Sequence, residues 1–346
     1  MKIADPKSVP IVLMGFGNVG RAFFRLVHEK KDLCRARYGL DPCFPAVFEV
    51  GGALIPAKSF LEPADAPESS VSDLVRNPFW NPAGKLEDVL ASHSPGVLVE
   101  CTPTNLKTGE PGLAHIRKAL EMGWHVATAS KGPLVVDFKG LKALALDKGV
   151  SLKFSGAAAA ALPTLDVGLY SLAGTQVSAV EGVLNGTTNF ILTRMGEGGS
   201  YAAALQEARE RGIAEPDPSL DVGGWDTAAK IMLIANAVMG TEFTLADLSV
   251  TGITDLSPAL LVRAESEGKI LKLLGTVRRN EGTYSAGVAP TLLDPSHPLA
   301  AVNGTAKGVT FWTDTMGQVT VTGGKSDPRG AAAALLKDII NIFPRD

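Results

Sequence analysis

The densest group of residues that could do chemistry lies at positions 208–230, where the chain reads ARERGIAEPDPSLDVGGWDTAAK. Its carboxylates follow one another closely: Glu215, Asp217, Asp221 and Asp226. Prolines and glycines stand between them, and these residues favour stiff, tight turns. A rigid loop of this kind can present acids to a cationic ligand, so the segment indicates a binding site for a positively charged group.

Lys230 is the one charged residue of the stretch 227–241, which is apolar on nearly every side and predicts a buried helix. A buried lysine needs a partner, and Asp226 precedes it by one helical turn. One interpretation is a lysine held beside a carboxylate in a cleft. The other is that Asp226 caps the helix while Lys230 extends along the surface to solvent.

A glycine fingerprint near the N-terminus indicates a second kind of site. The apolar run 9–14 leads into GFGNVG, and residues 21–30 have helical spacing. In such a strand, turn and helix, the first glycine permits the turn, the second lets backbone approach a pyrophosphate, and the third allows close helix packing. The helix N-terminus then faces the phosphates. These residues predict a dinucleotide site, with a glycine turn of another doubly wound fold as the alternative: Gly15, Gly17, Asn18, Val19 and Gly20.

The choice between NAD and NADP depends on the second strand, whose end usually carries an acid that binds the adenosine ribose. The best candidate strand, residues 46–50, runs into Gly51-Gly52-Ala53, and we expect no acid at its end. Lys58 lies a little further on and could accommodate a 2′-phosphate. The sequence therefore favours NADP over NAD, unless Lys58 is a solvated loop residue.

Two further strand ends lie where a doubly wound sheet brings the chain past its ligand. The strand expected at 97–100 ends in Cys101-Thr102-Pro103, and the strand expected at 125–128 leads to Ala129-Ser130-Lys131. We therefore expect Thr102, Ser130 and Lys131 beside the cofactor. The alternative for Lys131 is an ordinary loop lysine.

These sites require an α/β fold with two domains. Alternating strands and helices predict a Rossmann-type doubly wound parallel sheet in a dinucleotide-binding domain, residues 1–156, completed by a C-terminal helix within 325–346. Residues 157–324 predict an inserted α+β domain that carries catalysis. Further elements are expected as helices at 112–122, 138–148, from 190 and at 330–342, and as strands at 151–154, 177–184, 268–277, 284–290, 307–313 and 318–322.

Composition excludes several classes of partner. The net charge is −3 and no basic run stands out, so nucleic-acid binding is not indicated. No apolar signal region is present, and no apolar run approaches the roughly 20 residues of a membrane span, so we expect a cytoplasmic protein with a small-molecule substrate. The cysteines lack CxxC spacing and nearby histidines, so neither a disulfide framework nor a metal site is expected: Cys34, Cys43 and Cys101.

Four motifs agree with one known family of enzymes: residues 15–20, Ala129-Ser130-Lys131, the segment 185–189 (NGTTN) and the segment 208–230. On these motifs the chain resembles homoserine dehydrogenase over nearly its whole length. The resemblance implies reduction of L-aspartate 4-semialdehyde to L-homoserine by a reduced nicotinamide, a step toward threonine, methionine and isoleucine. It also implies a homodimer that forms through the sheet of the second domain.

The resemblance further implies roles for single residues. The counterpart of Lys230 is the favoured acid/base, and that of Lys131 positions substrate and supports proton transfer. The chemistry agrees, because an aldehyde oxygen that becomes an alkoxide needs a positive donor and a proton. The ammonium and carboxylate of the substrate are expected to meet the following residues: Glu215, Asp226, Asp221, Asn185, Gly186 and Thr187.

The chain departs from the family pattern at two places. Ser155 and the alanines 157–161 replace an acid and a glycine cluster, which argues against a strong monovalent-cation site of that type. The turn 323–330 is not the usual glycine-rich one, so some nucleotide contacts are expected to differ. Three other functions are alternatives: an oxidoreductase for another amino-acid aldehyde or keto acid, an enzyme with Cys101 as nucleophile, and a non-catalytic nucleotide sensor. Retention of both lysines argues against the sensor.

Overall fold

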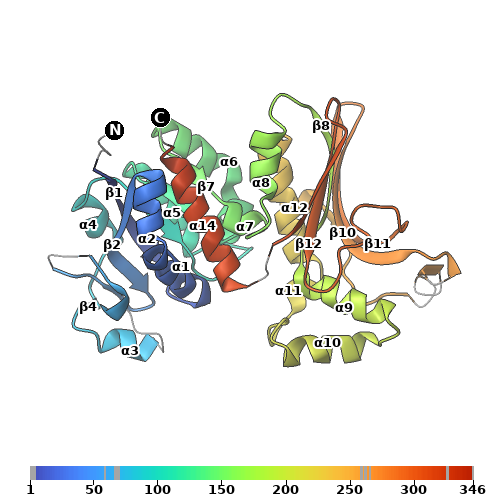
Figure 1. The fold of residues 1–346 in the computed structure, drawn as a ribbon, viewed down its shortest axis with the longest axis horizontal. Coiled ribbons are helices and arrows are strands. Elements are labelled where there is room, and N and C mark those ends of the chain that lie inside the picture. Colours follow the sequence, from blue (N-terminus) through green and yellow to red (C-terminus); the bar gives the residue numbers. More distant parts are fainter. Residues whose placement is uncertain are drawn as a thin grey trace. The chain divides into compact units, whose positions relative to one another are not determined.

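The computed structural model describes residues 5–57, 60–65, 71–257, 260, 263–264, 266–324 and 327–344. The chain divides into two compact units, residues 1–160 with 327–346 and residues 161–326 (Figure 1). The first contains a seven-stranded sheet and the second a six-stranded sheet. The predicted α/β class is therefore confirmed, while the functions assigned to the two domains stay predictions.

The sheet of the first unit has the order β4-β3-β2-β1-β5-β6-β7. Its parallel strands are β1 (Lys7–Met14), β2 (Leu40–Glu49), β5 (Val97–Glu100), β6 (His125–Thr128) and β7 (Leu152–Lys153). The antiparallel edge consists of β3 (Gly52–Leu54) and β4 (Trp80–Asn81). Because β2 and β5 flank β1, the strand order reverses at β1. Ligands of doubly wound sheets bind at this point, outside the carboxyl ends of the strands.

Two helices from opposite ends of the chain, α1 (Asn18–Glu29) and α14 (Pro328–Ile342), pack against each other in this unit (Figure 1). Residues of β1, α1 and α14 share one apolar core. Ser155 also joins the two chain ends, because its N–H and hydroxyl donate to Asp338 at 2.9 and 2.7 Å. The other helices are α2 (Lys31–Leu33), η1 (Cys34–Tyr38), η2 (Pro63–Asp65), α3 (Val71–Val75), α4 (Leu86–Ala91), α5 (Gly112–Glu121), α6 (Gly132–Asp147) and α7 (Ser155–Ala158).

The second unit has the strand order β13-β12-β8-β10-β11-β9. Its strands are β8 (Val177–Val183), β9 (Ser249–Val250), β10 (Ile270–Asn280), β11 (Thr283–Leu293), β12 (Lys307–Thr313) and β13 (Gln318–Gly323). Its helices include α8 (Thr164–Asp166), η3 (Val167–Ser171), α9 (Gly186–Gly196), α10 (Tyr201–Glu210), α11 (Ser219–Val222), α12 (Trp225–Val238) and η4 (Leu245–Asp247). A Cβ atom at Gly275 would lie 3.1 Å from side chains of α12, so this glycine lets α12 approach the sheet closely.

Two helices begin earlier than the sequence predicts. α9 starts at Gly186 rather than Phe190, because the Asn185 side chain accepts from the Thr188 N–H at 2.9 Å and caps the helix. α6 starts at Gly132 rather than Phe138, and a kink at Asp137 (φ −145°, ψ 55°) joins its two parts. Both helix starts depend on side-chain capping or on a backbone kink, and apolar periodicity predicts neither.

A buried amine holds α9 to the sheet of the second unit. Lys272 of β10 is 1% exposed, and its ammonium donates to Asn189 Oδ1 (3.1 Å), Asn303 Oδ1 (2.9 Å) and the Val302 carbonyl. Burial lowers the pKa of Lys272 to about 8. Asn189 is the last residue of the NGTTN segment, so this contact fixes one end of that motif.

Cys34 and Cys43 are buried free thiols, and burial raises the pKa of both, in keeping with their predicted role as packing residues. Across the residues that the structure describes, no helix is long and apolar enough to span a membrane. Within the same residues, no group of three or more His, Cys, Asp or Glu is arranged to hold a metal ion.

Candidate functional site

The glycine turn after β1 shows a different packing reason at each glycine. Gly15 has a φ of 86°, and a Cβ there would lie 2.9 Å from the Thr102 nitrogen. A Cβ at Gly20 would lie 2.1 Å from the Gly15 carbonyl oxygen, whereas no atom of the described residues lies within 4 Å of the Cβ position of Gly17. Gly17 precedes α1, whose N-terminus is not capped by a side chain. Packing thus requires the outer two glycines, and open space above Gly17 lets a ligand approach the helix end.

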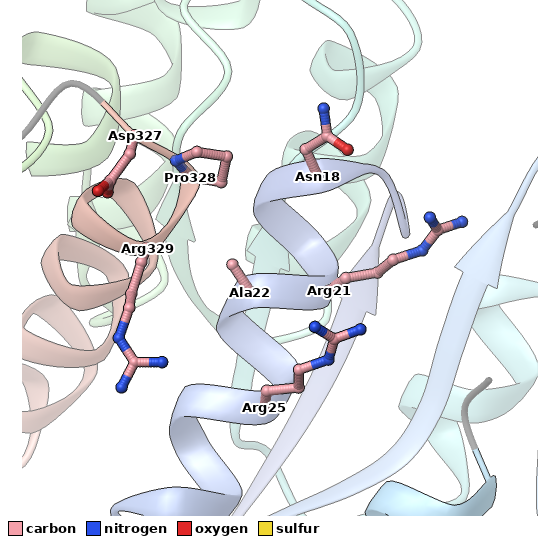
Figure 2. Close-up of a pocket in the computed structure, with 7 residues that line it drawn as sticks. All are labelled: Asn18, Arg21, Ala22, Arg25, Asp327, Pro328 and Arg329. Carbon is pink, nitrogen blue, oxygen red and sulfur yellow. The ribbon is translucent and has the colours of Figure 1, made fainter. Parts of the chain in front are cut away.

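A cavity of about 510 Å³ lies beside this turn, lined by Asn18, Arg21, Ala22 and Arg25 of α1 and by Asp327, Pro328 and Arg329 at the start of α14 (Figure 2). The lining thus contains three arginines and one carboxylate, and that carboxylate, Asp327, caps α14 by accepting from the Gly330 N–H at 2.6 Å. Arg329 also donates to Glu29 at 2.6 Å, but the three arginines still outnumber the two carboxylates, so the positive charge of the lining favours an anionic group such as phosphate.

Arg21 is the arginine of this cavity that is closest in sequence to the glycine turn. Its Nε is buried and has no hydrogen-bond partner among the described residues, and its guanidinium lies 5.6 Å from the ring centre of Phe16. The arginines of the cavity were not among the expected site residues. For Arg21 the signal was its position directly after Gly20, whereas Arg329 is brought in by the distant helix α14.

The end of β2 corrects one prediction. The strand ends on Glu49, so the expectation that no acid stands there was wrong. The Glu49 carboxylate accepts from the Phe16 N–H of the glycine turn at 2.6 Å and from the Val50 N–H at 3.0 Å. An acid at this place is the group that binds a ribose hydroxyl in dinucleotide-binding sheets. Lys58, the basis for expecting NADP, lies outside the described residues.

The remaining candidates of the first unit lie at the carboxyl ends of β5 and β6. Thr102 follows β5, and its N–H donates to Glu100 Oε1 at 2.6 Å. Ser130 is 3% exposed and its N–H donates to Thr128 Oγ1 at 3.0 Å. Lys131 precedes α6 with a half-buried side chain, and its N–H donates to Thr104 Oγ1 at 3.4 Å. All three thus occupy the sheet edge that the glycine turn also occupies.

Cys101 does not have the properties of a nucleophile. Burial raises the pKa of its thiol well above the usual value, and the charge of Glu100 raises it further. The reactive form of cysteine is the thiolate, so the environment of Cys101 disfavours the alternative in which this residue attacks a substrate.

The second unit brings four predicted site residues into one hydrogen-bonded cluster. Lys230 Nζ lies 2.6 Å from Asp226 Oδ2 and 3.0 Å from the Leu184 carbonyl oxygen. The Asn185 side-chain amide donates to Asp226 Oδ2 at 2.8 Å and to Asp221 Oδ1 at 2.7 Å. The cluster therefore contains one ammonium and two carboxylates, held together by one amide.

Three helices position this cluster: Asn185 caps α9, Asp221 lies in α11, and α12 carries Asp226 and Lys230. Gly224, with a φ of 84°, is the residue before α12, and Asp226 lies in the first turn. Asp226 binds Lys230 and does not cap the helix, so the interpretation with Lys230 extended to solvent was wrong. The side chains of Lys230 and Asp226 are 15% and 11% exposed. A carboxylate near a helix N-terminus is also stabilised by the helix dipole.

Three other expected residues belong to the same two sequence segments as the cluster, 185–189 and 208–230. Gly186 is the first residue of α9. The Thr187 hydroxyl donates to the Ile213 carbonyl at 3.0 Å, which joins the NGTTN segment to the acidic loop. Glu215 follows in that loop with an exposed side chain. The structure thus connects the two sequence motifs, while Glu215 stays at the surface of its unit.

A family model described as homoserine dehydrogenase matches residues 163–340. The homoserine dehydrogenase of Methanocaldococcus jannaschii is 35% identical over 335 residues, which cover 96% of this chain and 98% of the relative. The NAD(+)-dependent homoserine dehydrogenase of Pseudomonas canavaninivorans is 33% identical over 335 residues, which cover 96% of this chain and 95% of the relative.

Among solved structures, a protein of Archaeoglobus fulgidus provisionally named homoserine dehydrogenase is similar with a TM-score of 0.85 and 32% identity. The match covers 97% of this chain and 100% of that one. Sequence and structure thus agree over nearly the full length of the chain, including both units. The chain belongs to the homoserine dehydrogenase family and is an oxidoreductase.

Proposed function

We propose that the chain catalyses the reversible reduction of L-aspartate 4-semialdehyde to L-homoserine with a nicotinamide dinucleotide. The observation that carries the proposal is the cluster around Lys230, in which a lysine ammonium is held at 2.6 Å by a carboxylate in a member of this family. A substrate with an aldehyde at one end and an ammonium at the other matches the proton donor and the carboxylates. This match disfavours a keto acid, which has no ammonium, and membership of the family favours this substrate over other amino-acid aldehydes.

The reduced nicotinamide, when bound, supplies the hydride that reaches the aldehyde carbon. Lys230 Nζ then gives a proton to the oxygen that becomes an alkoxide. Asp226 holds this ammonium and Asn185 holds Asp226, so both act on the orientation of the donor. Lys131 is proposed to support the proton transfer.

The other end of the substrate is proposed to bind residues of the acidic loop and of the α9 N-terminus. Carboxylates of Asp221, Asp226 and Glu215 would attract the ammonium. The Thr187 hydroxyl and the backbone at 185–186 would donate to the substrate carboxylate, because the N-terminus of α9 favours negative charge.

We propose NAD(H) as the preferred cofactor, because Glu49 ends β2. Its two bonds to backbone N–H groups leave lone pairs for ribose hydroxyls, since a carboxylate offers about four acceptor sites. The 2′-phosphate of NADPH would meet a like charge there. The relative from Pseudomonas canavaninivorans, named as NAD(+)-dependent, supports the same choice.

Purified protein is expected to oxidise NADH when given L-aspartate 4-semialdehyde, with kcat/KM for NADH at least about tenfold above that for NADPH, because like-charge contacts cost several kcal/mol. Glu49→Gln removes the charge and keeps an acceptor for the Phe16 N–H, so it is expected to reduce this preference about tenfold. Nicotinamide absorbance measures both values. Equal use of the two cofactors by the unaltered protein would contradict the role of Glu49, and no turnover with either would contradict the function.

The six-stranded sheet is proposed to form a homodimer. Gly275 faces α12, so Thr276 and Arg278 point to the opposite face of β10. The Arg278 guanidinium lies 5.9 Å from the ring centre of Trp312 on that face, and its side chain is 54% exposed. Exposed arginine and aromatic side chains are enriched at subunit interfaces. Light scattering is expected to give twice the chain mass, and a mass of one chain would contradict the dimer.

A further inference from the structure

The carboxyl end of β5 holds a buried carboxylate to which the proposed reaction assigns no role. Glu100 is 0% exposed. Its Oε1 accepts from the backbone N–H of Thr102 at 2.6 Å and also from the Thr102 hydroxyl. Its Oε2 lies 2.8 Å from His115 Nδ1 of α5, and the Nδ1–H tautomer of His115 donates to this oxygen.

The first turn of α5 closes around this carboxylate. A Cβ atom at Gly112 would lie 3.3 Å from Glu100 Cδ and 2.9 Å from Pro133 Cγ, so no side chain fits between the helix and Glu100. The N-terminus of α5 favours a negative charge beside it. The His115 side chain is 23% exposed and Thr102 is also partly exposed, whereas Glu100 is fully buried. The whole arrangement lies within the first unit.

The peptide that Glu100 holds also supports the glycine turn. A Cβ at Gly15 would lie 2.9 Å from the Thr102 nitrogen and from the Cys101 carbonyl carbon, so the turn rests directly on this peptide. Glu100 therefore fixes a backbone segment against which the first glycine of the fingerprint packs.

The hydroxyl of Thr102 has its one proton directed to Glu100. Toward any other group it can only accept a hydrogen bond, because a hydroxyl has one donor and two lone pairs. β5 lies on the other side of β1 from β2 and Glu49. A dinucleotide with its adenosine ribose at Glu49 extends across β1 and places its nicotinamide half at β5.

We propose that Glu100 and His115 are positioning residues that present Thr102 Oγ1 as a hydrogen-bond acceptor to the nicotinamide half of the cofactor. The donor is the carboxamide N–H or a ribose hydroxyl of that half. The proposal rests on the proposed function in one respect, since it requires that the first unit binds a nicotinamide dinucleotide.

Binding of NADH and of ADP to the full-length chain, measured by calorimetry without aldehyde, tests this proposal. His115→Leu and Thr102→Val are each expected to raise the Kd for NADH about tenfold. This is the effect of losing one hydrogen bond to a charged or well-oriented group. The Kd for ADP, which lacks the nicotinamide half, is expected to stay within twofold of the unaltered protein. His115→Asn is the matched control, because its side-chain amide places an N–H near the position of Nδ1 and is expected to restore NADH binding.

A purely structural role predicts a different pattern. Equal weakening of NADH and ADP in His115→Leu, or unchanged NADH binding in both His115→Leu and Thr102→Val, would overturn the proposal. Failure of the unaltered chain to bind NADH would overturn it together with the proposed cofactor. If NADH binds but L-aspartate 4-semialdehyde is not reduced, the proposed substrate fails while the NADH and ADP comparison still decides the role of His115.

Discussion

Lys230→Met is expected to lower kcat for NADH oxidation by about 10³-fold, because a positioned general acid contributes about 10² to 10⁴ in rate. Methionine keeps much of the side-chain length and apolar volume of lysine but gives no proton to the alkoxide. Binding of NADH is assigned to the first unit, so its Kd is expected to stay within twofold. Steady-state absorbance and direct NADH titration measure the two quantities.

Two further variants test whether the loss of activity is specific to the Lys230 ammonium. Lys269→Met removes a lysine of the same unit that pairs with Glu267 and Asp294, and it is expected to keep kcat within twofold. Asp226→Asn keeps the shape of the partner but removes its charge, so it is expected to lower kcat less than Lys230→Met does. A Lys230→Met protein that retained more than about a tenth of the kcat would show that another group donates the proton.

Gly20→Ala is expected to abolish measurable NADH binding and to lower the Tm. Its Cβ would lie 2.1 Å from the Gly15 carbonyl oxygen, a backbone atom that can move only if the whole turn moves. Overpacking of this kind costs about 1–3 kcal/mol or more. Thermal unfolding followed by circular dichroism measures the Tm, and calorimetry measures NADH affinity.

Gly17→Ala separates stability from binding. Since no atom in the described part of the chain lies within 4 Å of a Cβ at Gly17, this variant is expected to keep the Tm. The methyl group would fill the space through which a pyrophosphate approaches the helix end, so NADH affinity is expected to fall at least about tenfold. Normal NADH binding by Gly17→Ala would place the dinucleotide phosphates away from this turn.

Most of what the sequence could predict came from local patterns, that is, from apolar periodicity and short motifs. The strand at 307–313 has the observed bounds, and Lys230 meets Asp226 because one helical turn joins them. The glycine turn was predictable because its motif is local, and contacts with the segment after β5 and within the turn require Gly15 and Gly20. Sequence best predicts the helices and strands that have strong apolar periodicity and clear terminating residues.

Contacts between segments that are distant in sequence could not be predicted from local patterns. Asn185 donates to carboxylates 36 and 41 residues away, and only the family resemblance grouped them. Glu49 was overlooked because the expected strand ran one residue past it into the glycines. Arg329 enters the cavity beside α1 from the far end of the chain, and no spacing rule connects it with the fingerprint. Side-chain capping by Asn185, which moved the start of α9, depends on backbone geometry that composition does not reveal.

The pairing of α1 with α14 has a consequence for how the protein is made. Residues 161–326 form one uninterrupted unit, whereas Leu335 and Ile339 of α14 complete the core that Leu13 and Phe23 begin. During translation the inner unit has its strands before α14 leaves the ribosome, and domains fold as units as they emerge. The first unit therefore keeps an apolar face uncovered until α14 has been synthesised. The segment synthesised first is therefore the last to finish folding.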